Sequence, residues 1–207
     1  VGLGTRAGGG HLSVNQATTT LVIASGNAGK VREFGDLLAD LGIQTLPQPQ
    51  NLEVEETGSS FAENARLKAE AVARATGCWA LADDSGLSVD ALGGAPGVHS
   101  ARYAHSDSAR IERLLRELME AAALSQDSRS ARFTAALALA NPAGRVELEV
   151  EGSCPGLILE APRGEGGFGY DPVFFVPEAG LTFAEMSHQQ KAALGHRGRA
   201  FAALKPR

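Results

Sequence analysis

The most constraining feature of this sequence is a buried strand joined to an amphipathic helix by a glycine-rich turn. Residues 21–24 form an apolar run with the length and branching of a buried strand. Two glycines interrupt the pattern over residues 25–30, and apolar residues then recur at three- and four-residue steps as far as Gly42. A strand, a tight turn and a helix in this order predict an α/β fold with a ligand site at the carboxyl end of the strand.

A second helix and strand follow along the chain. Ser60 and Glu63 have the spacing of a capping box, and small apolar residues continue to Gly77, so a helix is expected between them. Residues 78–82 form another apolar run, which ends in Asp83-Asp84-Ser85-Gly86. This pattern predicts a second buried strand whose carboxyl end again presents polar side chains.

The rest of the chain predicts a mixed sheet. A helix is expected over 111–123, and strands are expected over 132–140, 146–150, 157–159 and 173–176. Helices are expected after Ser187, with a break near Gly195, because a glycine inside a helix costs about 1 kcal/mol. No linker divides residues 20–207, so they are interpreted as one α/β domain, and residues 1–19 as a mobile tail or a remnant of expression.

The bulk composition excludes several classes of function. Nineteen basic and twenty-four acidic side chains give a net charge of -5, which lacks the basic surface needed to bind nucleic acid or an anionic membrane. No apolar stretch approaches the roughly 18 residues of a membrane span, so a soluble protein is expected. Cys78 and Cys154 lie far apart without metal-ligand spacing, which favours a reducing compartment such as the cytoplasm.

The turn from Ser25 to Lys30 has the chemistry of a phosphate site. Unpaired N–H groups and the positive end of the helix dipole favour an anion there. Gly26 and Gly29 allow close approach of the backbone, Ser25 and Asn27 can donate hydrogen bonds, and Lys30 adds a positive charge. The spacing is not that of a Walker A loop. Such turns also join strands to helices without binding anything, so this signal is weak by itself.

Two acidic pairs, Glu55-Glu56 and Asp83-Asp84, suggest a metal site. Hard cations such as Mg²⁺ prefer carboxylate oxygens, and adjacent carboxylates repel each other unless a cation or a raised pKa relieves them. We therefore expect the pairs to meet around magnesium, with one carboxylate left to orient a water. A solvated acidic turn is the alternative, and the spacing does not decide between the members of either pair.

The remaining candidates lie on a helix face and near the C-terminus. Lys68 shares a helix face with Asn64 and could point toward phosphates, although a solvated face is common. Phe168 stands between glycines, which suits an aromatic platform for a base but also a packed loop anchor. A polar set suited to a base edge or a phosphate completes the candidates: Asp171, Lys191, His196 and Arg197.

Several motifs in this order resemble the inosine triphosphate pyrophosphatase family, in particular its bacterial members that act on non-standard purine nucleotides. The resemblance runs from about residue 20 to residue 204. Its motifs are SGNAGK at 25–30, EETG at 55–58, ADDSGL at 82–87, GGAPGV at 93–98, SARY at 100–103, GGFGYDP at 166–172, and Lys191 with GHR at 195–197.

The resemblance implies a fold and an activity. The implied fold is α/β, with an elongated mixed sheet flanked by helices and two lobes that enclose the active site in a cleft. The implied activity is magnesium-dependent hydrolysis of ITP, dITP and XTP to the monophosphate and pyrophosphate. The enzyme would be a cytoplasmic homodimer that cleanses the nucleotide pool.

The resemblance also implies residue roles. Asp84 would be the general base, and Glu55, Glu56 and Asp84 would handle magnesium. A 6-oxo purine would accept hydrogen bonds from His196 or Arg197, whereas the 6-amino group of adenine would present a donor to a donor. The substrate-binding residues would be Ser25, Gly26, Asn27, Ala28, Gly29, Lys30, Lys68, Ser85, Phe168, Gly169, Tyr170, Asp171, Lys191, His196 and Arg197.

Two other functions remain open at this level. A pyrophosphatase of the fold-related Maf type would act on ordinary or modified pyrimidine nucleotides. A nucleotide-binding regulatory module would have lost hydrolysis, and substitutions in the acidic pairs would be its signature. Glu55, Glu56, Asp83 and Asp84 are all present here.

Overall fold

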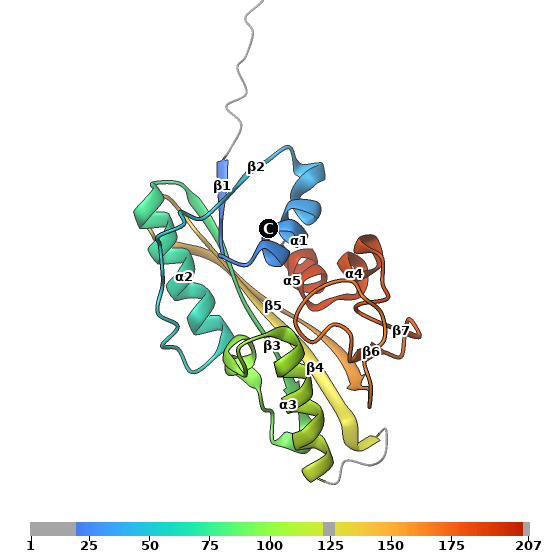
Figure 1. Ribbon diagram of the computed structural model, residues 1–207. Helices are drawn as coiled ribbons and strands as arrows, with labels where there is room; N and C mark the ends of the chain where they lie inside the picture. Colours follow the sequence, from blue (N-terminus) through green and yellow to red (C-terminus); the bar gives the residue numbers. More distant parts are fainter. Residues whose placement is uncertain (1–19, 122–126, 205–207) are drawn as a thin grey trace, which may run out of the picture.

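The structure, a computed structural model, describes residues 20–121 and 127–204 and is built on one seven-stranded sheet in the order β2-β1-β3-β4-β5-β6-β7 (Figure 1). The strands are β1 (Thr20–Ala24), β2 (Gln44–Pro47), β3 (Trp79–Val89), β4 (Ser130–Ala140), β5 (Val146–Ile158), β6 (Phe174–Val176) and β7 (Leu181–Thr182). The helices are α1 (Ala28–Leu38), α2 (Phe61–Thr76), α3 (Asp107–Glu120), α4 (His188–Leu194) and α5 (His196–Leu204). The predicted α/β class with a mixed sheet is confirmed.

The parallel part of the sheet ends early, which exposes an edge of β3. β1 pairs in parallel with β2 and with the first residues of β3, and its last partner pair is Ala24 with Ala82. β3 continues to Val89 and pairs with β4 in antiparallel fashion. Between Ala82 and Leu87, no strand in the described part of the chain covers β3 on the β1 side. This backbone edge lies beside the 25–30 turn.

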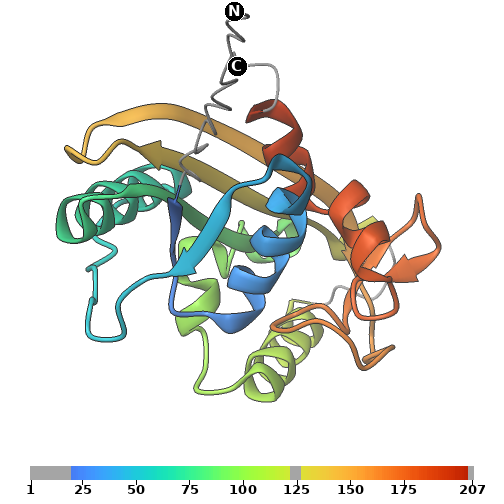
Figure 2. The ribbon, with the colours of Figure 1, turned by 90° about the horizontal axis from the view of Figure 1, so that it is seen from above.

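Helices cover both faces of the sheet because the strands alternate two apolar sets. Val22, Ala80 and Ala136 belong to a core formed with α2. Their neighbours Ile23 and Leu81 belong to a core formed with α1 and α5 on the opposite face. Figure 2 shows α2 and α1 on different sides of the strands. Side chains that project from the middle of β3 therefore meet α2 on one face and α1 with α5 on the other.

A third apolar core lies toward the other end of β3 and β4. It joins Leu114 and Leu118 of α3 to aromatic side chains that include Phe133, Phe174 and Phe183. In Figure 1, α3 lies near this end, whereas α2 lies near the opposite end of β3. The polar stretch of β3 is thus located between this third core and the two cores that flank the start of the strand.

Helix signals were accurate at the ends of α2 and α4. By contrast, α1 ends at Leu38 and a 3₁₀ turn continues to Leu41 before the expected end at Gly42, and α3 begins at Asp107 rather than at residue 111. Ser60 caps α2 and Gly77 ends it in the left-handed conformation that glycine favours. The capping box of Ser187 and Gln190 begins α4, and the helix breaks at Gly195 as expected. α3 ends at Glu120, and the part of the expected helix beyond residue 121 lies outside the described residues, as does the tail expected over residues 1–19.

The strand predictions need three corrections. β3 does not end before Asp83: it runs through the acidic pair, because cations on both faces neutralise the carboxylates within the strand. β5 is one strand rather than two, because within residues 20–121 and 127–204 its outer edge has no strand partner before Leu157 and can accommodate Pro155, which lacks an N–H. β2 and β7 were missed, since four and two residues are too short for a periodic signal.

Two glycines allow α5 to pack closely, one against β5 of the sheet and the other against α4. A Cβ on Gly152 of β5 would lie 2.1 Å from the backbone N of Ala200, and a Cβ on Gly198 would lie 1.7 Å from the carbonyl O of Ala192. No side chain can be accommodated at such distances, so glycine permits the contact. This contact brings the start of α5, with His196 and Arg197, under the carboxyl end of β1. Within the described ranges, no helix is long and apolar enough to cross a membrane.

Candidate active site

Strand geometry separates the two adjacent aspartates. Successive side chains of a strand point to opposite faces, so Asp83 projects toward α1 and α5 with Leu81, and Asp84 projects toward α2 with Ala82. Both carboxylates are buried. The repulsion expected between them is thus relieved by separation as well as by cations.

Asp83 is held by cations from α1 and α5. Its Oδ2 lies 2.8 Å from Lys30 Nζ and 3.3 Å from Arg197 Nε, and it accepts a hydrogen bond from Ser85 Oγ at 3.1 Å. Arg197 also donates to Ser85 Oγ at 2.6 Å. This group binds the phosphate turn to the start of α5 through one carboxylate.

Asp84 belongs to a different group on the α2 face. Lys68 Nζ lies 3.0 Å from Asp84 Oδ1 and 2.8 Å from Glu56 Oε1, and it also donates to the Asp83 carbonyl at 2.8 Å. Buried Asn64 donates to Asp84 Oδ2 at 3.2 Å and accepts from the Gly58 N–H at 2.8 Å, which attaches the 55–58 segment to the strand. The structure therefore brings Glu56, and not the exposed Glu55, to Asp84.

The two aspartates have pKa values shifted in opposite directions. Burial opposes ionisation of Asp83, but the charges of Arg197 and Lys30 outweigh it and hold the pKa of Asp83 far below its ordinary value. Burial raises the pKa of Asp84, and Lys68 offsets only part of this effect. Asp83 is thus a fixed negative charge, whereas Asp84 has the increased proton affinity that a general base needs.

The 25–30 turn differs in one respect from what its sequence suggested. The Asn27 side chain caps α1 by accepting hydrogen bonds from Gly29 N and Lys30 N at 2.9 and 3.1 Å, so these two N–H groups are not free for an anion. Asn27 N in turn donates to Ser25 Oγ at 3.1 Å. The Ser25 hydroxyl proton and the Ala28 N–H are left to face a phosphate at the positive end of the helix dipole.

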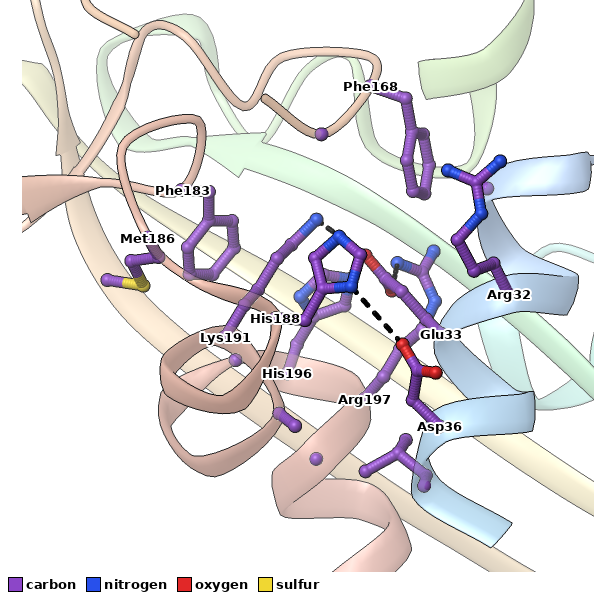
Figure 3. A pocket seen from close by; sticks show the side chains of 16 residues that line it. Arg32, Glu33, Asp36, Phe168, Phe183, Met186, His188, Lys191, His196 and Arg197 are labelled. Atoms are coloured by element: carbon purple, nitrogen blue, oxygen red, sulfur yellow. Dashed lines mark hydrogen bonds and ion pairs between the residues drawn. The ribbon is translucent and has the colours of Figure 1, made fainter. Parts of the chain in front are cut away.

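A pocket of about 240 Å³ opens between α1, α4, α5 and the loop that carries Phe168. Figure 3 shows Phe168 on one wall, Phe183 and Met186 on another, and the charged ends of Lys191 and Arg197 directed into the space between them. The Lys191 ammonium lies 4.8 Å from the centroid of the Phe168 ring. The Phe168 side chain is half-buried rather than exposed, which fits a pocket wall better than a surface platform for a base.

Glu33 of α1 organises the cations of this pocket. It accepts from Lys191 Nζ at 2.6 Å and from Arg197 Nη1 at 2.8 Å. Burial opposes ionisation of Glu33, but Arg197 and Lys191 lower its pKa below the ordinary value. Asp171 holds the other side of Lys191 at 2.6 Å. The two cations are therefore fixed in position before any ligand arrives.

His196 lies at the inner end of the pocket as a neutral imidazole. It is 2% exposed and stacks on Phe133 with ring centroids 4.7 Å apart. Burial, with the nearby charge of Arg197, lowers its pKa well below the ordinary value. Both ring nitrogens are buried without a hydrogen-bond partner in the described part of the chain. Such orphaned groups are costly, so a ligand with polar edges would satisfy them.

The loop residues expected in the base pocket have different positions. Of residues 168–171, Phe168 lines the pocket. Asp171 Oδ2 accepts from Phe168 N at 3.0 Å, Gly169 N donates to Asp107 Oδ2 at 2.7 Å, and the Tyr170 hydroxyl donates to the Ser100 carbonyl at 2.9 Å. In this structure, the last three residues shape the loop rather than the pocket surface.

Sequence reasoning missed residues whose signal appears only in the fold. Glu33 and Asp107 looked like ordinary charged residues on helix surfaces. Arg102, which forms an ion pair with Glu56 across 46 residues of sequence, lay within a recognised motif without an assigned role. For Glu33 a weak signal existed, because it follows Lys30 by one helical turn on the same side of α1.

The carboxylates fit a magnesium ion bound together with a substrate. Among residues 20–121 and 127–204, no three His, Cys, Asp or Glu side chains gather closely enough to enclose a metal. Mg²⁺ usually takes one or two carboxylates and completes its shell with water and substrate phosphates. Glu56 and Asp84, which share Lys68, meet this requirement, and Asp83 Oδ1 is a buried acceptor without a partner in the described chain.

Comparison with known proteins finds relatives that match most of this chain. The chain matches the Ham1 family over residues 21–207. It is 64% identical over 186 residues to the dITP/XTP pyrophosphatase of Synechococcus sp. (strain CC9311), covering 90% of this chain and 88% of that protein. It is 61% identical over 196 residues to that of Prochlorococcus marinus (strain MIT 9313), covering 94% of each. A solved HAM1 protein from Coxiella burnetii superimposes with a TM-score of 0.80 at 44% identity, covering 91% of this chain and 97% of that one. The Staphylococcus aureus Ham1 protein gives 0.76 at 40% identity with the same coverage.

Proposed function

Because this chain belongs to the Ham1 family, we infer that it is a dITP/XTP pyrophosphatase, a hydrolase that releases a nucleoside monophosphate and pyrophosphate. The family resemblance expected from the motifs is confirmed by these relatives. One combination of features in the site supports this inference. Burial raises the pKa of Asp84, and a pocket lined by cations ends at His196, whose ring nitrogens have no partner in the described part of the chain.

The proposed substrate position follows from the distribution of donors. The triphosphate would lie over the uncovered edge of β3, where the 25–30 turn and the ammonium groups of Lys30 and Lys68 meet. The base would enter the pocket beneath Phe168. The substrate would therefore bridge the two faces of the sheet at the point where β1 stops.

In the proposed reaction, Asp84 takes the proton of a water whose oxygen attacks the α-phosphorus. The bond from this phosphorus to the bridging oxygen breaks, and pyrophosphate leaves with the bonding electrons. Lys30 and Lys68 offset negative charge on the phosphates, which keeps the attacking and leaving oxygens in line. Asp83 does not take part in proton transfer but holds Lys30 and Arg197 in place.

Magnesium is proposed as the cofactor, bound by Glu56 and Asp84 together with the phosphates. When bound, it would neutralise phosphate charge and polarise the reacting oxygens. The shared Lys68 would then shift its contact toward the substrate. Glu55 is not included among the proposed magnesium ligands, because it is exposed and contacts neither Asp84 nor Lys68 in the described chain.

Purine selectivity is proposed to arise at the inner end of the pocket. A 6-oxo group can accept from Arg197 or from the protonated nitrogen of His196. The other imidazole nitrogen can accept from N1–H of the same base. The 6-amino group of adenine would face donors with a donor and leave buried groups unpaired, which typically lowers kcat/KM by several orders of magnitude in sites of this kind.

A substrate panel tests the proposed function. With magnesium present, dITP, ITP and XTP are expected to be hydrolysed far faster than ATP, GTP or pyrimidine triphosphates, with pyrophosphate as product. Products are resolved by anion-exchange chromatography, because release of inorganic phosphate would indicate a different bond cleavage. Equal rates across the panel would contradict the purine specificity. Preference for pyrimidine nucleotides would favour a Maf-type enzyme, and binding without turnover would favour a regulatory module.

We also propose that the protein acts as a homodimer in the cytoplasm, where the nucleotide pool it would cleanse is located. The resemblance to its family supports this proposal. Light scattering of the purified protein tests the dimer: a mass of twice 21.4 kDa is expected. A single-chain mass at micromolar concentration would contradict it.

A further inference from the structure

Arg32 differs from the other cations around the base pocket because no carboxylate neutralises it. Lys191 and Arg197 each contact two carboxylates, and Lys30 contacts Asp83. Arg32 lines the same pocket and is exposed, and within residues 20–121 and 127–204 it forms no hydrogen bond or ion pair. Its five N–H donors are therefore available to a ligand.

Arg32 lies where the part of a bound nucleotide between the phosphates and the far edge of the base would be. It lies on α1 two residues after the end of the 25–30 turn, and it lines both the base pocket and a second hollow beside Ser25 and Gly26. Figure 3 shows its guanidinium group beside Phe168, away from the wall formed by Phe183 and Met186. Arg32 thus lies between the proposed phosphate site and the inner end of the pocket.

A purine placed in this pocket would present different edges to its two ends. With the 6-oxo group at His196 and Arg197, the edge that carries N3 and the 2-substituent is left nearer to the ribose and the phosphates. We propose that Arg32 recognises this edge and thereby favours xanthine and opposes guanine at the 2-position. The proposal rests on the proposed function and adds the determinant of discrimination among 6-oxo purines.

The chemistry of the three bases supports this role. Xanthine has a 2-oxo acceptor, and its nucleoside loses a proton near neutral pH, which places negative charge on N3 and O2. A guanidinium group, which only donates, can bind such an edge with charge-assisted hydrogen bonds. The 2-amino group of guanine would present a donor to this donor. Hypoxanthine has only a C–H at this position, so Arg32 would neither favour nor oppose its binding.

No carboxylate in the described part of the chain forms an ion pair with Arg32. Asp36, four residues further along α1, lies 3.4 Å from His188 Nδ1, and Glu33 is occupied by two cations. The titratable and charged side chains around the pocket are Glu33 and Asp36 on α1, His188 and Lys191 on α4, and His196 and Arg197 on α5. The buried cations Lys191 and Arg197 are already paired with carboxylates, and His196 is neutral. Arg32 is therefore the cation that remains available to bind an anionic base.

Substrate discrimination in Arg32 variants tests the proposal. Arg32→Gln is expected to lower kcat/KM for XTP about tenfold, roughly the effect of one charge-assisted hydrogen bond, and to leave dITP within about twofold of the parent. Arg32→Lys, which keeps the charge, should retain most of the XTP activity. Arg116→Gln removes an exposed arginine from α3 and serves as a matched control. Turnover of dITP reports that each variant is folded.

The outcomes separate the two proposals. If the parent hydrolyses dITP and XTP, and Arg32→Gln lowers both equally or leaves XTP unchanged, the role of Arg32 is wrong. A rise of kcat/KM for GTP relative to dITP in Arg32→Gln would support the opposition to guanine, and an unchanged GTP-to-dITP ratio would contradict it. If the parent hydrolyses neither dITP nor XTP, the proposed function itself fails.

Discussion

Replacing Asp84 with asparagine is expected to lower kcat for dITP by roughly 10²–10⁴-fold, the range that a positioned general base supplies. Asparagine keeps the shape of the side chain and one acceptor oxygen, which can serve only one of the two donors Lys68 and Asn64, and it cannot take a proton from water. Steady-state rates measure the loss, and calorimetric titration with a magnesium–nucleotide complex should still detect binding. A rate close to that of the parent would exclude Asp84 as the base.

The same substitution should leave the fold intact or make it slightly more stable. Because burial raises the pKa of Asp84, its ionised form is disfavoured in the folded protein relative to the unfolded chain. Removing that charge relieves the penalty at neutral pH, and Lys68 keeps Glu56 as a partner. Asp40→Asn, which alters an exposed acid away from the site, is the matched control for both activity and urea unfolding.

Asp83→Asn is expected to destabilise the fold by about 3–5 kcal/mol, as removal of one partner from a buried ion pair does. Lys30 would lose its carboxylate partner, and Arg197 would keep only Glu33. Urea unfolding of the ligand-free protein at neutral pH measures the effect. A stability loss no larger than that of Asp84→Asn would contradict the assignment of Asp83 to structure rather than to proton transfer.

The stability difference between the parent protein and Asp83→Asn depends on pH in a way that follows from the lowered pKa of Asp83. The pKa of Asp83 is depressed in the fold, so its stabilising contribution is fully present above the ordinary aspartate pKa of about 3.9 and is lost as the pH falls below it. The stability difference between parent and Asp83→Asn should stay constant from pH 7 to about pH 5. It should narrow only in more acidic solution. A difference that vanished near pH 6 would point to another group.

Much of the architecture could be read from local patterns. The capping residues Ser60 and Ser187 and the break at Gly195 acted as expected, because helix ends depend on side chains only a few residues apart. The end of the second strand was placed wrongly because Asp83 and Asp84 look like turn residues. Only the cations supplied by α1, α2 and α5 make them acceptable inside β3.

The sequence by itself determined the α/β class, the phosphate turn, the acidic pairs and the family, since these depend on residue types at short spacing. Only the tertiary structure decided the division of labour within the pairs. Alternation along β3 directs Asp83 to Lys30 and Arg197 and Asp84 to Lys68, and the register of β1 leaves their backbone edge uncovered. The physical reason is that pKa, pairing and access depend on charges and burial contributed by segments far apart in the chain, which no local pattern encodes.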